Sequence, residues 1–219
     1  MKGRISIVLI LLSLLTSLLA IPNNLFSFVT FRRPACLRNG VGHYLLYLSV
    51  VNQVNHALLM ARLLHIILGL TVHAPHPLLS NISCKVLNYS LSCCTRISLW
   101  LGTFVAVERV YTTMFLTSQR FKQPHIARRL ISIAFSVILL SSAYELVFTR
   151  SFSSMNERSG VICVTEFPLR YQSLWTVLHQ TISMEHFLCP LLINLGCTCT
   201  IIAMVIRAKM NLQERRPAA

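Results

Sequence analysis

The chain has 219 residues, of which 54% are hydrophobic and only 12% are charged, and the hydrophobic residues are gathered in long blocks. This composition excludes an ordinary soluble domain and indicates an integral membrane protein in contact with lipid. The net charge of +14 comes from basic residues dispersed among the connections, which argues against the basic face that nucleic-acid binding requires.

Five hydrophobic blocks are long enough to cross a bilayer. Lipid offers no hydrogen-bond partner to the backbone, so each block should be an α-helix. No soluble domain or internal repeat interrupts them. We therefore predict an all-α fold, a polytopic transmembrane helical bundle that forms a single domain over residues 1–219, with spans at residues 5–31, 43–70, 86–107, 126–148 and 174–206.

The first block has two interpretations. Lys2 and Arg4 precede an apolar run that ends at Ala20, as in a secretory signal peptide. However, Leu18 stands where a cleavage site needs a small residue, and the apolar stretch resumes as far as Phe31. The sequence alone leaves open whether residues 1–20 are removed.

Basic residues predict the orientation. If the N-terminus is outside, twelve Lys and Arg fall in connections on the cytoplasmic side and six fall outside. By the positive-inside rule, this twofold excess favours an outside N-terminus and a cytoplasmic C-terminus. Two Asn-X-Ser sequons begin at Asn81 and Asn88. Asn81 is the expected glycosylation site because it is predicted to lie in an outer loop, whereas Asn88 lies inside the third span.

The third span is bounded by two landmarks, Cys84 and the pair Glu108-Arg109. At about 1.5 Å per residue, Cys84 and Glu108 are about 36 Å apart along a helix, slightly more than a bilayer core. Together with Cys163 in the long outer connection, these landmarks resemble those of a rhodopsin-like (class A) G-protein-coupled receptor. The run from Ser98 to Val110 is similar to that family's third helix.

Two further residues match landmarks of the same family. Asn24 matches the asparagine of its first helix, and Pro190 matches the proline of its fifth helix. The chain also departs from the family pattern. Val110 replaces an aromatic residue, the second span has Asn52 and Gln53 but no acid, and the fourth span has no tryptophan. The missing acid puts a family-type sodium site in doubt.

The resemblance implies a receptor that binds an extracellular ligand and signals to a heterotrimeric G protein from the plasma membrane. Glu108 would restrain Arg109, whose guanidinium contacts the G protein once it is freed. The family has seven spans and this sequence has five, so we expect an orphan receptor or a truncated form of one. Association with other receptor molecules is a further expected partnership.

We predict two pairs of side chains, a disulfide at the outer face and an ion pair in the membrane interior. With the N-terminus outside, Cys84 and Cys163 are the only cysteines at the outer face, so we expect a disulfide between them. Arg96 lies near mid-depth in the third span and needs a partner there. We predict an ion pair with Glu185, which lies at a similar depth in the last span.

The sequence offers little raw material for catalysis or metal binding. It has no aspartate, no Gly-rich phosphate loop, and no His or Cys at zinc-ligand spacing. We therefore expect no enzyme, no cofactor and no metal site. Two alternatives remain, namely a small transporter or channel subunit with Arg96 and Glu185 along its path, and a non-signalling fragment that associates with full-length receptors.

Overall fold

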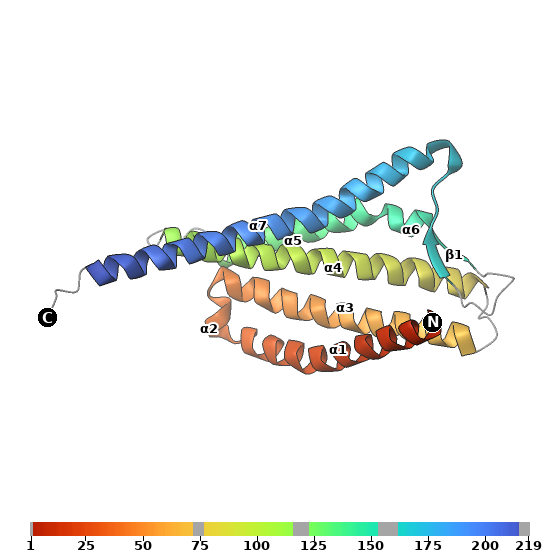
Figure 1. The fold of residues 1–219 in the computed structure, drawn as a ribbon, viewed down its shortest axis with the longest axis horizontal. Coiled ribbons are helices and arrows are strands. Elements are labelled where there is room, and N and C mark those ends of the chain that lie inside the picture. The colour runs from red at the N-terminus through yellow and green to blue at the C-terminus, as the bar shows by residue number, and fades with distance from the viewer. Residues whose placement is uncertain (1, 72–76, 116–122, 153–161, 215–219) are drawn as a thin grey trace.

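The computed structural model describes residues 2–71, 77–115, 123–152 and 162–214. Long helices run alternately up and down along one axis (Figure 1). Their bounds are α1 Lys2–Phe31, α3 Gly40–Thr71, α4 Pro77–Met114, α5 Pro124–Ser142 and α7 Gln172–Glu214. Shorter elements connect them, namely α2 Pro34–Leu37, α6 Tyr144–Phe148, the strands β1 Thr149–Phe152 and β2 Ile162–Thr165, and the 3-10 helix η1 Leu169–Tyr171. The structure is therefore the all-α helical bundle that the sequence predicts.

The ends of the helices define two faces of the bundle. The start of α1 and the strands lie at one end, whereas α2 and the C-terminal end of α7 lie at the other (Figure 1). We call these the hairpin end and the α2 end. Each long helix overlaps one predicted span. Helix α4 begins nine residues before residue 86 and ends seven residues after residue 107, and α5 ends at Ser142, six residues before residue 148.

Helix α4 is the central element, packed against α3, α5, α6, α7 and both strands. The apolar core lies where α3, α4 and α5 meet, and it is formed by Tyr44, Val51, Cys93, Ile97, Leu101, Ala127, Ile131 and Ile138. Helices α1 and α7 instead expose long rows of hydrophobic side chains, such as Leu18 and Leu19 on α1 and Leu191 and Leu192 on α7. These surfaces suit contact with lipid.

Within the described residues, four segments are long and apolar enough to cross a membrane: 11–31, 81–114, 124–148 and 169–210. Helix α3 is not among them, and it carries the polar residues Asn52, Gln53 and Arg62. It nevertheless runs beside α1 and α4 along the bundle (Figure 1). The predicted second span therefore stays a prediction.

The fourth span and the connection after it differ from a simple helix and loop. The helix is interrupted at Ala143, which separates α5 from α6. The chain then forms an antiparallel pair of strands in which Ser151 lies opposite Cys163. Sequence analysis does not predict this hairpin, although Ile162, Val164 and Thr165 are β-branched residues of the kind that strands favour.

A close backbone contact fixes the turn between α1 and α3. Gly42, in the first turn of α3, is buried against α2, and a Cβ atom built on it would lie 1.9 Å from the backbone oxygen of Cys36. No side chain fits in that space. Glycine is therefore required for α2 to pack against the start of α3.

Candidate functional site

A cavity of about 500 Å³ opens between α4, α6, α7 and strand β2, near the hairpin end. Its α4 wall is formed by residues at helical spacing, which therefore share one face of that helix. The facing wall comes largely from α7. The lining residues are Asn88, Leu91, Ser92, Thr95, Arg96, Leu99, Glu145, Thr165, His179, Ser183, His186 and Phe187. We call this space the outer cavity.

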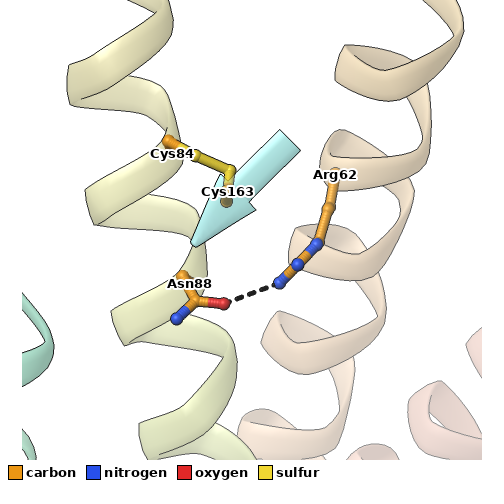
Figure 2. The surroundings of a disulfide bond; sticks show 4 residues. All are labelled: Arg62, Cys84, Asn88 and Cys163. Atoms are coloured by element: carbon orange, nitrogen blue, oxygen red, sulfur yellow. Dashed lines mark hydrogen bonds between the residues drawn. A yellow bond between two sulfur atoms is a disulfide. The ribbon is translucent and has the colours of Figure 1, made fainter. Parts of the chain in front are cut away.

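A disulfide joins Cys84 of α4 to Cys163 of β2, the same pair that the sequence predicts. It fastens the hairpin to the buried face of α4 and so keeps Thr165 at the wall of the outer cavity. One helical turn further along α4, the Asn88 amide oxygen accepts a hydrogen bond of 2.8 Å from Arg62 Nη1 of α3 (Figure 2). The mouth of the outer cavity is thus braced by one covalent and one polar link.

Arg96 lies at the base of the outer cavity, and only 8% of its surface is exposed. Its Nη2 forms an ion pair with Glu145 Oε1 at 2.9 Å and donates a longer hydrogen bond of 3.4 Å to Ser183 Oγ. Its Nη1 donates to Ser142 Oγ. The predicted partner, Glu185, is wrong, because the carboxylate that neutralises Arg96 belongs to Glu145 of α6.

Helical geometry explains why Glu185 is not the partner. Ser183 and His186 of α7 both face α4, and successive residues of a helix point about 100° apart. Glu185 therefore points away from α4 and is exposed. The break at Ala143 has the opposite effect on Glu145, since α6 begins there and carries this carboxylate to Arg96. Arg96 and Glu185 line different cavities.

His186 of α7 contacts both α4 and α5, about one helical turn beyond Arg96 toward the α2 end. The Trp100 indole Nε1–H of α4 donates to His186 Nδ1 at 3.1 Å, and His186 Nε2 lies 3.0 Å from Ser141 Oγ of α5. Because Nδ1 accepts, a neutral ring carries its proton on Nε2 and donates to Ser141. His186 thereby connects the wall of the outer cavity to the bundle interior.

Polar contacts continue from there toward the α2 end. Thr103 Oγ1 accepts a hydrogen bond of 3.0 Å from the Asn194 amide and lies 3.4 Å from the Pro190 carbonyl oxygen. Ser98 donates to Asn52 Oδ1 of α3 at 2.8 Å. The predicted landmark Pro190 therefore lies at a contact between α4 and α7, and the other landmark, Asn24, is buried within α1.

At the α2 end, Glu108 and Arg109 have different surroundings. Glu108 is 3% exposed, and its Oε1 accepts a hydrogen bond of 3.1 Å from the backbone N–H of Val41. Val41 lies in the first turn of α3, where backbone N–H groups have no partner within the helix. Arg109 is exposed and, with Glu108, lines a second cavity of about 380 Å³. Glu108 thus acts as a helix cap supplied by another helix.

The predicted glycosylation site, Asn81, does not lie where the sequence placed it. Asn81 lies within α4, which begins at Pro77, and not in an outer loop. The second sequon, at Asn88, is occupied by the contact with Arg62. In the described ranges, no three His, Cys or Glu side chains gather as a metal ion would require.

Comparison with known proteins identifies the class. The chain matches the family described as 7 transmembrane receptor (rhodopsin family) over residues 23–219. It therefore belongs to the rhodopsin family of seven-transmembrane receptors, the family that the landmarks of α4 resemble. No curated protein matches the chain closely enough to count as a relative.

Sequence reasoning missed several residues of the outer cavity, of which Glu145 is the most important. It is the single acid of the fourth predicted span, and that fact could have drawn attention to it. Ser142, three residues earlier, shares its direction toward Arg96. The serines Ser92 and Ser183 carried no signal, because serine is common in membrane helices.

Proposed function

We propose that this chain is a plasma-membrane receptor that binds an extracellular ligand in the outer cavity and signals to a heterotrimeric G protein at the α2 end. In this proposal, residues 1–219 act as a single transmembrane domain. The observation that carries the proposal is the outer cavity itself. It combines a buried ion pair with polar and apolar walls, in a chain of a receptor family.

The composition of the outer cavity favours ligand binding over a purely structural role. Binding sites for small molecules are mostly apolar concavities of about 300–1,000 Å³ with a few convergent polar groups. Here Leu91, Leu99 and Phe187 provide apolar surface, while Arg96 and Glu145 provide charge. The hairpin held by Cys84 and Cys163 covers one side.

The α2 end suits contact with a soluble protein. Arg109 is exposed beside the second cavity, and the segment from Tyr111 to His125 follows it in the chain. The positive-inside rule puts this end in the cytoplasm and the N-terminus outside.

Asn81, near the hairpin end of α4, is then our proposed glycosylation site, and loss of a glycosidase-sensitive mass shift in Asn81→Gln tests it.

The test of signalling is nucleotide exchange. The purified chain is reconstituted in lipid nanodiscs with one G-protein heterotrimer of each major Gα class, and binding of a non-hydrolysable GTP analogue is followed without ligand. We expect basal exchange above that of empty nanodiscs for at least one class. Arg109→Ala should abolish this increase.

Arg129→Ala is the matched control, because Arg129 is also an exposed arginine near the α2 end, on α5. It should leave exchange unchanged. If no Gα class responds, or if both arginine variants lose exchange equally, coupling through Arg109 is wrong. The non-signalling receptor partner then becomes the better description of this chain.

A further inference from the structure

The Glu145 carboxylate uses its two oxygens unequally. Oε1 accepts from Arg96 Nη2 at 2.9 Å and from Ser92 Oγ at 3.0 Å. Oε2 is buried and has no hydrogen-bond partner among the described residues. Arg96 and Glu145 are therefore joined by a single hydrogen bond, although a guanidinium and a carboxylate can form two parallel ones.

The donors of Arg96 are directed elsewhere. Ser142 and Ser183 take hydrogen bonds from its guanidinium, which fixes it across α5 and α7. None of these contacts brings a donor to the second oxygen of Glu145. A carboxylate that is only 3% exposed is left with unmet acceptor capacity at the wall of a cavity. Leaving a buried acceptor unsatisfied is costly.

Building on the proposed function, we propose that the outer cavity takes a ligand with a protonated amine, which donates a hydrogen bond to Glu145 Oε2, and with an apolar or aromatic body. A cationic donor forms a charge-assisted hydrogen bond, which is stronger than a neutral one. Leu91, Leu99 and Phe187 suit the apolar body.

The other charged and titratable groups around the cavity agree with this assignment. The charge of Arg96 is balanced by Glu145 in direct contact. Arg62 donates to Asn88 at the outer rim. His186 is held between Trp100 and Ser141, and His179 Nδ1 lies 2.8 Å from the Tyr144 hydroxyl. Glu145 is thus the lining group whose acceptor capacity is unmet.

The experiment uses three probes with the same phenyl body, namely 2-phenylethylamine, 2-phenylethanol and 3-phenylpropionate. The full chain is purified in detergent with its disulfide intact, and its thermal unfolding midpoint is followed as each probe is added to about 10 mM. A ligand that binds only the folded state raises this midpoint in a saturable way. We expect the amine to do so and the carboxylate to have no effect.

Variants identify the group responsible. Glu145→Gln should weaken binding of the amine about tenfold or more, because it replaces a charged acceptor by a neutral amide and so loses the charge-assisted hydrogen bond. Glu185→Gln is the matched control on the outward face of α7, and it should bind the amine as the unmodified chain does. If Glu145→Gln does not fold, Arg96→Gln/Glu145→Gln replaces it, since this variant removes both charges together and should also lose the preference for the amine.

The inference is overturned if 3-phenylpropionate stabilises the chain as much as the amine, if the amine has no effect, or if the charge-removing variant binds the amine within twofold of the unmodified chain. Nucleotide exchange distinguishes this failure from failure of the proposed function. Exchange without amine binding would remove only the assignment of the ligand class. Amine binding without exchange would support the site and overturn G-protein coupling.

Discussion

Helix α4 carries two charged sites with opposite surroundings, one buried and one exposed. Arg96 is enclosed near mid-depth, with its charge balanced by Glu145 and its donors shared with serines of α5 and α7. Arg109, about 20 Å further along the helix, is exposed beside a cavity. A charge in the membrane interior needs partners from the protein, whereas a charge at the interface reaches water. The first site therefore holds helices together, and the second is available to a partner.

The largest effect should come from breaking the Arg96 pair. Arg96→Met or Glu145→Leu alone should destabilise the chain by about 3–5 kcal/mol, because each leaves an uncompensated buried charge. The double variant Arg96→Met/Glu145→Leu should recover much of that loss, since replacement of a whole buried pair by apolar residues is often nearly neutral. Thermal unfolding in detergent measures all three.

The control for this cycle is Arg96→Met/Glu185→Leu. Glu185 is exposed on α7 and does not contact Arg96, so this pair of changes should show no recovery. If the losses of stability in Arg96→Met and Glu145→Leu simply add in the double variant, the ion pair does not couple α4 to α6. Recovery with Glu185 instead would restore the partner that the sequence suggested.

The comparison extends to the hairpin end, where the link is covalent. Cys84 and Cys163 are separated by 79 residues, and closing a loop of that length stabilises by about 4 kcal/mol on the chain-entropy model. Cys84→Ser/Cys163→Ser should lower the unfolding midpoint accordingly, whereas Cys199→Ser, at an exposed free cysteine, should not. Mass spectrometry of non-reduced peptides checks the bond directly, and free thiols at both positions would contradict it.

Sequence alone predicted what depends on long, local patterns. The five hydrophobic blocks overlap the five long helices, and the order of Cys84, Glu108 and Cys163 pointed to the family. It did not predict the partner of Arg96, because that depends on a helix break at Ala143 and on which face of α7 packs inward. Depth along a span can be counted from sequence, but rotation about the helix axis depends on packing.

A smaller effect should come from the turn at the α2 end. Gly42→Ala forces a Cβ atom against the Cys36 carbonyl, so α2 must move away from α3. We expect a loss of about 1–3 kcal/mol, as for other overpacked sites. Gly102→Ala is the matched control, because a Cβ there meets nothing within 4 Å, and helix propensity should make it neutral or slightly stabilising. Equal effects of both changes on the unfolding midpoint would contradict the close contact.

The smallest loss of stability should follow Glu108→Gln, which separates charge from hydrogen bonding at the second site. The amide oxygen can still accept from the Val41 N–H, whereas the attraction between the carboxylate and the positive N-terminus of α3 is lost. We expect about 0.3–1 kcal/mol for this change, and more for Glu108→Ala, which removes the acceptor from Val41 altogether.

Basal nucleotide exchange gives the same substitution a functional readout. If Glu108 holds the foot of α4 against α3 and thereby restrains Arg109, Glu108→Gln should raise basal exchange although the fold is nearly as stable. Glu166→Gln, at an exposed acid beside the hairpin, should change neither quantity. Unchanged exchange in Glu108→Gln would leave Glu108 as a helix cap and remove its role in restraint. Increased exchange that disappears with Arg109→Ala would tie the exposed arginine to the signal, because the buried Arg96 site is unaltered in both variants.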